Sequence, residues 1–383
     1  MKNFTFANPV KIIFGKGTIK EIAKEIPAEQ RIMILYGGGS IKKNGVYDQV
    51  TKALEHHVWF EFSGIEANPH YETCREAVAA IRGHQVDFLL AVGGGSVIDA
   101  VKFIAAAARY EGDPWDFLTG KSRINRAMPF GTVLTLPATG SEMNKGFVIS
   151  KAEIQEKLAA NSPLTYPKFS ILDPETTYTL PERQTANGII DTFVHVTEQY
   201  LTFNNHALLQ DYFAEAILKV LVEEGPRVFD HPADYNIRAN LMWASTWGLN
   251  DWIGQGVTTD WATHMIGHEL TAFFGIDHGQ SLAIVLPGVM NVMRKEKEEK
   301  ILQMGKNIFH LEKGTTDQRI DQTIASVENF FKSLGVKTKL SDYSVNEAGI
   351  QKVVNRFKER DWALGEHENI TYGVVAEILG ERK

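Results

Sequence analysis

The stretch that decides the fold is residues 87–99, DFLLAVGGGSVID, where an apolar run ends in three glycines. The run from Asp87 to Val92 is short and rich in β-forming residues, which is typical of a strand buried in a parallel sheet. From Val97 to Ala108 the chain is almost entirely apolar or small, as expected for a helix packed on that sheet. The stretch therefore predicts a strand, a glycine turn and a helix in succession.

The glycine triplet at residues 93–95 suits a phosphate-binding turn, although it does not fit the dinucleotide fingerprint G-x-G-x-x-G. Residues without side chains let backbone amides approach a diphosphate at the positive end of a helix. Ser96 is placed to cap that helix, and Asp99 completes the spacing of a capping box. The alternative interpretation is a tight, well-capped turn that binds no ligand.

The rest of the first half repeats this alternation. Strand candidates lie at residues 31–36, 132–136 and 169–172, and residues 71–82 show a helical pattern between the first two glycine turns. Short apolar strands that alternate with helices predict an open α/β domain with a parallel sheet.

From about Pro181 the sequence changes to helical periodicity with few strand signals. The helical segments are residues 183–201, 208–223, 237–251, 259–274 and 317–334. Leu180-Pro181 and Gly225-Pro226 are interpreted as element boundaries. We therefore expect two domains, an α/β domain over residues 1–180 and an all-helical domain over residues 181–383.

Composition excludes several classes of protein. The 383 residues carry 40 basic and 47 acidic side chains, a net charge of −7, which argues against nucleic acid or an anionic membrane as partner. The single cysteine excludes an intrachain disulfide and a zinc site of two or more thiolates. The N-terminus has no apolar core long enough for a signal peptide, and no apolar stretch is long enough for a membrane span, so a cytoplasmic setting is expected.

A second glycine triplet, at residues 37–39, would lie at the adenosine end if the chain binds a dinucleotide. An acidic residue after such a strand would bind the ribose 2′-hydroxyl and repel a 2′-phosphate. This chain instead has Ser40, followed by Lys42 and Lys43, which favours NADP(H) over NAD(H). The alternative is a plain loop with solvated lysines. The segment from Thr135 to Glu142 could wrap a cofactor or form an ordinary turn.

Carboxylate and imidazole side chains recur at helical spacing in the second half. Asp191 and His195 are four residues apart, as are His264 and His268, so each pair shares one helix face. His278 follows in an expected loop. One carboxylate and several imidazoles suit Zn²⁺ or Fe²⁺, whereas each pair alone is more often an incidental surface pair.

In combination these motifs resemble the iron-containing (group III) alcohol dehydrogenase family. They are G-G-S-x-x-D at residues 94–99, TLPATGSE at 135–142, D-x3-H at 191–195 and H-x3-H-x9-H at 264–278. The resemblance runs from residues 12–17 to 369–371 and so covers nearly the whole chain. Residues 36–45 and 261–264 make it most similar to NADPH-dependent aldehyde reductases and butanol dehydrogenases.

The resemblance implies a dehydroquinate-synthase-like fold, with the dinucleotide between a nucleotide domain and a helical metal domain. The metal ligands would be Asp191, His195, His264 and His278. His268 would stand near the nicotinamide and is the candidate catalytic residue, in a proton relay. The implied NADP(H) contacts are Gly38, Gly39, Ser40, Asn68, Gly94, Gly95, Ser96, Asp99, Thr135, Thr139, Ser141 and Lys157.

The expected function is NADP(H)- and metal-dependent interconversion of small aldehydes and primary alcohols, mainly as aldehyde reduction. The metal would be Fe²⁺ or Zn²⁺, and the resemblance suggests a homodimer. One alternative is a lyase of dehydroquinate-synthase type, which would need more basic residues for an acidic substrate. Another is a non-catalytic binder of metal and nucleotide.

Overall fold

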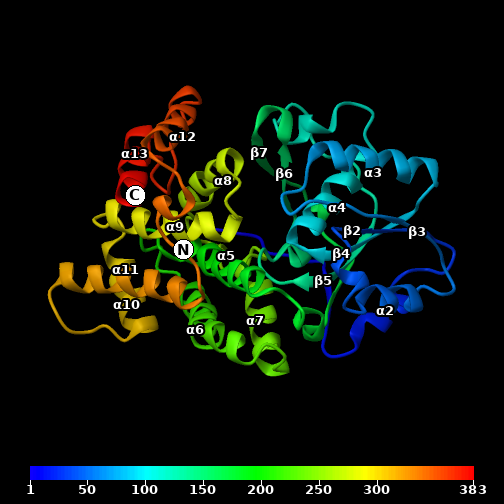
Figure 1. The fold of residues 1–383 in the computed structure, drawn as a ribbon, viewed down its shortest axis with the longest axis horizontal. Helices are drawn as coiled ribbons and strands as arrows, with labels where there is room; N and C mark the ends of the chain where they lie inside the picture. Colours follow the sequence, from blue (N-terminus) through cyan, green and yellow to red (C-terminus); the bar gives the residue numbers. More distant parts are fainter. The chain divides into compact units, whose positions relative to one another are not determined.

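Six parallel strands form one sheet in the computed structural model, which describes residues 1–383 (Figure 1). The strands are β1 (Lys11–Phe14), β2 (Arg31–Tyr36), β3 (Val58–Phe62), β4 (Phe88–Gly94), β5 (Phe130–Leu136) and β8 (Phe169–Leu172), in the order β1-β8-β5-β4-β2-β3. The four strands expected from apolar runs are confirmed as β2, β4, β5 and β8. The edge strands β1 and β3 are only half-buried, so their sequences lack the continuous apolar run that marks a central strand.

Helices cover both faces of this sheet. They are α1 (Ile22–Glu25), α2 (Val46–Ala53), α3 (Tyr71–Gly83) and α4 (Gly95–Ala107). Met33 and Leu35 of β2 lie in one apolar core with residues of α3 and α4. Ile32 and Ile34 lie in a second core with residues of α1 and α2. Because successive side chains of a strand point to opposite faces, this alternation places one helical layer on each side. An antiparallel hairpin, β6 (Gly146–Lys151) and β7 (Glu156–Asn161), completes the strands.

The second half is helical, as its periodicity predicts. Its helices are α5 (Glu182–Tyr200), α6 (Leu208–Asp230), α7 (Tyr235–Gly248), α8 (Ala262–Phe274), α9 (His278–Val292), α10 (Glu298–Phe309), α11 (Thr316–Ser333), α12 (Glu347–Glu359) and α13 (Tyr372–Glu381). Membrane crossing would need a longer and more apolar helix than any of these.

One expected boundary is wrong. Gly225 and Pro226 lie inside α6 and do not end a helix. At Gly225 the helix packs closely against α5 and α11, where an added Cβ would lie 3.3 Å from Ile189 and 3.5 Å from Phe330. Tertiary packing therefore carries α6 through the proline, which removes one backbone donor. The other expected boundary is correct, because Pro181 is the N-cap of α5.

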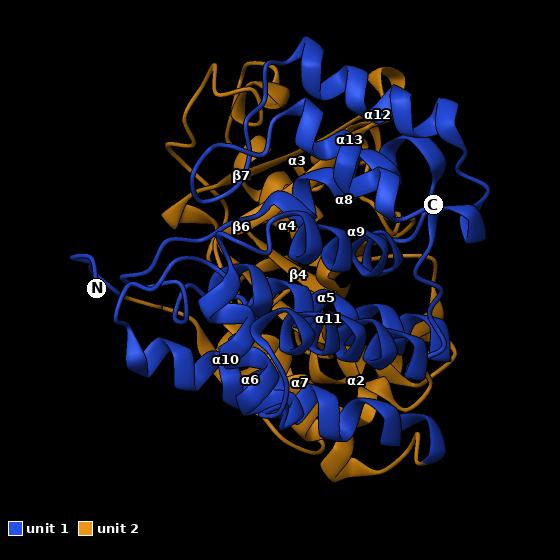
Figure 2. Ribbon diagram, turned by 90° about the vertical axis from the view of Figure 1, so that its left-hand side faces the viewer, with its two compact units in different colours: residues 1–6, 181–230, 247–383 blue, residues 7–180, 231–246 orange.

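The chain divides into two compact units (Figure 2). The α/β unit comprises residues 7–180 and 231–246, and the helical unit comprises residues 1–6, 181–230 and 247–383. Two segments therefore depart from the expected division into residues 1–180 and 181–383.

The side chains of α7 explain the larger departure. Met242 belongs to the apolar core of α3 and α4, and the ring of Trp243 lies 5.6 Å from that of Phe14. The hydroxyl of Thr246 donates to Glu142, which is completely buried in the same unit. Periodicity predicts that α7 is a helix but does not reveal the core in which its apolar side chains pack.

Thr246→Val should destabilise the chain by about 1–3 kcal/mol, since it leaves buried Glu142 without the hydroxyl donor. Thr132→Val is the matched control, because the Thr132 hydroxyl is buried in the same unit and makes no hydrogen bond. Urea unfolding followed by circular dichroism measures both changes. Equal stability of the two variants would contradict the role assigned to Thr246.

Candidate functional site

Helix α5 presents three acid and imidazole groups on one face. Asp191, His195 and Glu198 occupy positions i, i+4 and i+7, which share a face of an α-helix. All three are buried, with 4%, 5% and 2% of their surface exposed. Charged groups at this depth require close partners of opposite or polar character.

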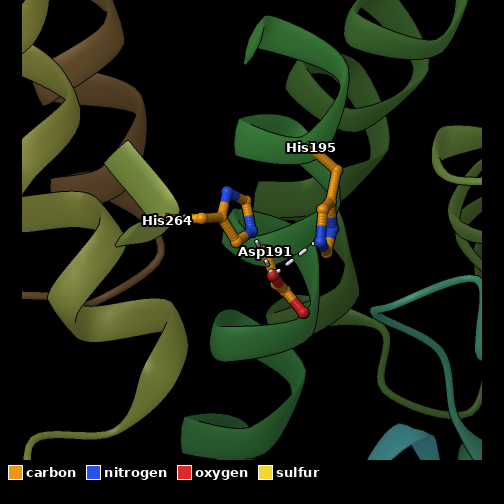
Figure 3. A group of neighbouring side chains, drawn as sticks. All are labelled: Asp191, His195 and His264. Atoms are coloured by element: carbon orange, nitrogen blue, oxygen red, sulfur yellow. Dashed lines mark ion pairs between the residues drawn. The ribbon is translucent and has the colours of Figure 1, made fainter. Parts of the chain in front are cut away.

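Three imidazoles gather around one oxygen of Asp191. Its Oδ1 lies 3.4 Å from Nδ1 of His195 and 3.6 Å from Nε2 of both His264 and His278. Figure 3 shows that Asp191 and His195 come from α5 and that His264 reaches them from α8. The possible ligand atoms of Asp191, His195 and His264 all lie within 4.8 Å of one another. His278 is not part of this tight group, although its Nε2 is as close to Asp191 as that of His264, and its side chain is the more exposed.

This donor set fits a divalent metal ion. One carboxylate with imidazole nitrogens is a ligand set typical of Zn²⁺ and non-haem iron. Nε2 of His264 is buried and makes no hydrogen bond, so its lone pair or proton has no hydrogen-bonding partner within the protein. The residues predicted as ligands from the sequence are therefore brought together from three helices.

Glu198 is a site residue that sequence reasoning missed. Its Oε2 pairs with Nδ1 of His264, and its Oε1 accepts a hydrogen bond of 2.5 Å from the backbone amide of Thr263. Burial alone would lower the pKa of His264, but the carboxylates of Glu198 and Asp191 raise it to about 9. The spacing of Glu198, seven residues after Asp191, was the available signal.

The start of α8 has an unusual backbone. Trp261, which precedes the helix, has a φ of 75°, a left-handed conformation that few residues other than glycine adopt. Asp260 accepts a hydrogen bond from the amide of Ala262, and Lys297 pairs with Asp260 at 2.8 Å. The Trp261 ring lies 5.5 Å from that of His264. This turn therefore sets where α8 begins and packs an indole beside the cluster.

The sequence predicted that His278 lies in a loop, but it is the first residue of α9. The preceding Asp277 accepts two hydrogen bonds from Arg183, at 2.6 and 2.7 Å, and one from Asn187 at 2.8 Å. At Gly279 an added Cβ would lie only 2.6 Å from the carbonyl oxygen of Asn187. Close backbone approach and the Arg183 ion pair therefore hold His278 against α5.

His268 lies one helical turn beyond His264 on α8 and is also buried. Its ring centroid is 5.2 Å from that of His278 and 6.3 Å from that of His264. It is outside the tight group of possible ligand atoms. The expected role of His268 in a proton relay stays a prediction.

Most of the expected cofactor residues of the α/β unit lie at or after the carboxyl ends of β2, β4 and β5, the edge where ligands bind in open parallel sheets. Asn68 instead lies between β3 and α3, and Lys157 lies on β7. After β2, Gly39 takes a φ of 87° before Ser40. Lys42 differs from expectation, because its ammonium contacts Glu61 at 3.2 Å and lies 4.6 Å from the ring of Tyr47. Of the two lysines, Lys43 is the one with no ion pair in the structure.

The capping box expected at α4 is wrong. The helix begins at Gly95 with no side-chain cap, because the hydroxyl of Ser96 donates to the carbonyl of Ala67. Asp99 accepts hydrogen bonds from Ser141 at 2.5 Å and from the amide of Val148 at 2.9 Å. Tertiary partners thus outcompete the local cap, and the start of α4 has no side-chain cap.

Other predicted cofactor residues meet in pairs. An added Cβ at Gly95 would lie 2.3 Å from the hydroxyl of Thr139, so only glycine allows this approach. The ammonium of Lys157 donates to Asn68 at 3.1 Å. Thr135 is buried near the end of β5. Gly94 is the last residue of β4, and Gly38 lies in the turn that follows β2.

A parallel sheet with glycine turns at its carboxyl edge, together with a helical unit that buries an Asp–His cluster, defines a class of nucleotide- and metal-dependent dehydrogenases. Family models identify the class directly. The model for iron-containing alcohol dehydrogenases matches residues 9–174, and the model for the C-terminal part of that family matches residues 185–382. The chain therefore belongs to the iron-containing alcohol dehydrogenase family.

Individual relatives agree with this assignment. The chain is 51% identical over 382 residues, 99% of each sequence, to the NADPH-dependent aldehyde reductase YqhD of Escherichia coli. It is 41% identical to a probable NADH-dependent butanol dehydrogenase of Bacillus subtilis, with 93% of each covered. The crystal structure of E. coli YqhD superposes with a TM-score of 0.98 at 49% identity, covering 100% of this chain and 99% of that one. The expected fold is thereby confirmed.

Gly279→Ala should weaken binding of Zn²⁺ roughly tenfold or more, because the new methyl group would push His278 away from α5. Gly380→Ala is the matched control, since its Cβ would meet nothing within 4 Å. Competition with a chromophoric chelator measures both affinities on the full chain. Unchanged affinity of the Gly279→Ala variant would show that this close approach does not position a ligand.

Proposed function

We propose that this chain is an NADP(H)- and metal-dependent oxidoreductase that interconverts aldehydes and primary alcohols, mainly by aldehyde reduction. The observation that carries the proposal is the convergence of three imidazoles on one buried carboxylate oxygen of Asp191. Membership of the iron-containing alcohol dehydrogenase family and the name of the E. coli relative support the reaction class.

Asp191, His195, His264 and His278 would hold the metal, with the Asp191 carboxylate offsetting part of its charge. A bound metal would supply Lewis-acid polarisation of the substrate carbonyl, and bound NADPH would supply hydride. Four ligands of this type accept either Fe²⁺ or Zn²⁺. Metal analysis of the protein as purified distinguishes the two ions.

The protein's own groups would orient the reactants and move the proton. His268 is placed beside His278, and an imidazole exchanges protons near neutral pH. We propose that a ring nitrogen of His268 gives a proton to the product oxygen, directly or through water. The uncapped amides at the start of α4 would receive the diphosphate of the cofactor.

The proposed preference for NADP(H) rests on the residues expected near the adenosine ribose of the cofactor. Gly38, Gly39 and Ser40 would meet the ribose and its 2′-phosphate, with the ammonium of Lys43 nearby in sequence. Lys42 contributes less positive charge there than the sequence suggests, because Glu61 pairs with it. The other implied contacts, Asn68, Gly94, Gly95, Ser96, Thr135, Thr139, Ser141 and Lys157, are proposed to hold the rest of the cofactor. For Asp99 we propose an indirect role, through Ser141.

Two features remain predictions of the resemblance and the composition, namely the homodimer and the cytoplasmic setting. Gel filtration with light scattering tests the first, and localisation of a tagged chain tests the second. Neither alternative function gains support from the comparisons, since the matching family models are those of alcohol dehydrogenases.

NADPH should be preferred over NADH in reduction of a panel of short aliphatic and aromatic aldehydes. One charge-assisted contact to the 2′-phosphate is worth about 1.5–3 kcal/mol, which corresponds to roughly tenfold or more in kcat/KM. Absorbance at the nicotinamide band measures both rates. A clear preference for NADH would overturn the cofactor assignment, and no oxidation of NADPH with metal bound would favour a non-catalytic binder.

His195→Ala should lose tightly bound metal and aldehyde reduction together, because the cluster would then offer one imidazole fewer. His56→Ala is the control, since His56 is a highly exposed histidine of the α/β unit. Metal stoichiometry after gel filtration and turnover are measured on both variants. Retention of metal and turnover in His195→Ala would remove this residue from the ligand set.

A further inference from the structure

Glu198 is a buried carboxylate that faces a proposed ligand without joining the ligand group. Only 2% of its surface is exposed, and it lies on the face of α5 that carries Asp191 and His195. The tight group of possible ligand atoms comprises Asp191, His195 and His264, and Glu198 is not among them. A carboxylate held at this depth beside the cluster needs a role of its own.

Both oxygens of Glu198 are occupied by donors from the start of α8. Oε1 accepts from the backbone amides of Thr263, at 2.5 Å, and of His264, at 3.4 Å. Oε2 pairs with the ring Nδ1 of His264. The two backbone amides fix Oε1 as an acceptor, and this in turn places Oε2 against the imidazole.

We propose that Glu198 is a positioning residue that selects the tautomer of His264 competent to bind metal. An ionised carboxylate only accepts hydrogen bonds, so the proton of a neutral imidazole stays on Nδ1. Nε2 then keeps its lone pair and faces Asp191, whose Oδ1 lies 3.6 Å away. The inference rests on the proposed function, because it concerns the same metal site.

Substitution by glutamine separates this role from a merely structural one. Gln has the size of Glu but replaces one oxygen by an NH₂ group, which donates. The backbone amides of Thr263 and His264 require the remaining oxygen, so the NH₂ group would face Nδ1 of His264. The imidazole would then accept at Nδ1 and carry its proton on Nε2, where it blocks the metal.

The experiment compares Glu198→Gln with Glu198→Ala on the full chain stripped of metal. Zn²⁺ affinity is measured by competition with a chromophoric chelator, and thermal unfolding is measured on the same metal-free samples. We expect Glu198→Gln to lose roughly 10- to 100-fold in Zn²⁺ affinity, the range found when a residue that orients a ligand is changed. Glu198→Ala should lose less, since its imidazole is free to take either tautomer.

The order of the two variants in Zn²⁺ affinity distinguishes a positioning role of Glu198 from a merely structural one. A structural role predicts that the isosteric Gln preserves both stability and affinity better than Ala does. The proposed role predicts the reverse order for Zn²⁺ affinity, while Gln remains the more stable metal-free protein. Nitrogen-15 NMR of histidine-labelled metal-free protein, recorded at a pH above the pKa of His264 so that its ring is neutral, supplies a second readout. We expect the His264 proton on Nδ1 in the wild type and on Nε2 in Glu198→Gln.

Glu328→Gln is the control for loss of a partly buried carboxylate, because Glu328 pairs with Arg382 at 3.2 Å elsewhere in the helical unit. It should lower the unfolding temperature and leave Zn²⁺ affinity unchanged. Wild-type affinity in Glu198→Gln, or tighter binding than in Glu198→Ala, would overturn the role of Glu198 alone. A wild-type chain that binds neither Zn²⁺ nor Fe²⁺ would overturn the proposed metal site and this inference with it.

Discussion

The helical unit depends on the burial of one carboxylate, that of Asp191, in the middle of α5. A charge with 4% exposure is costly unless cations or donors surround it, and here the partners are the imidazoles of His195, His264 and His278. Because His264 comes from α8 and His278 from α9, the beginnings of both helices must be held in place for the imidazoles to reach Asp191. Other interactions of the unit hold the helix starts that carry these imidazoles. Glu198 holds the start of α8, and Asp277 holds the start of α9.

In the α/β unit the main constraint is the close approach of backbone segments at the carboxyl edge of the sheet, where the cofactor is proposed to bind. Glycines at 94 and 95 leave room for the segment that follows β5, since an added Cβ would meet Leu136 at 2.9 Å or Thr139 at 2.3 Å. Asp99 then ties Ser141 to α4. The same glycines that permit this packing also leave the start of α4 without a side-chain cap. Close packing and the proposed binding of the diphosphate therefore place the same requirement on these two glycines.

Much of this could be predicted because it depends on local pattern. Apolar runs, two of them followed by a glycine triplet, predicted four of the six parallel strands, and i, i+4 spacing predicted that His195 lies beside Asp191. The missed features depend on partners distant in sequence. Ser96 bonds Ala67 instead of capping α4, and Lys42 pairs with Glu61 instead of staying free. Residues 237–246 are correctly predicted as part of a helix, yet no sequence pattern reveals that their side chains pack in the core of the α/β unit.

The turn before α8 connects the stability of the helical unit to its site. A non-glycine residue in the left-handed region costs of order 1–3 kcal/mol and persists only where its surroundings over-determine it. At Trp261 those surroundings are Asp260, which accepts a hydrogen bond from the amide of Ala262, and Lys297, which pairs with both Asp260 and Glu366 at 2.7–2.8 Å. Buried ion pairs are weak sources of net stability, because desolvation offsets much of their attraction. Their location therefore favours a positional role, in which the Lys297 network fixes the turn from which His264 reaches Asp191.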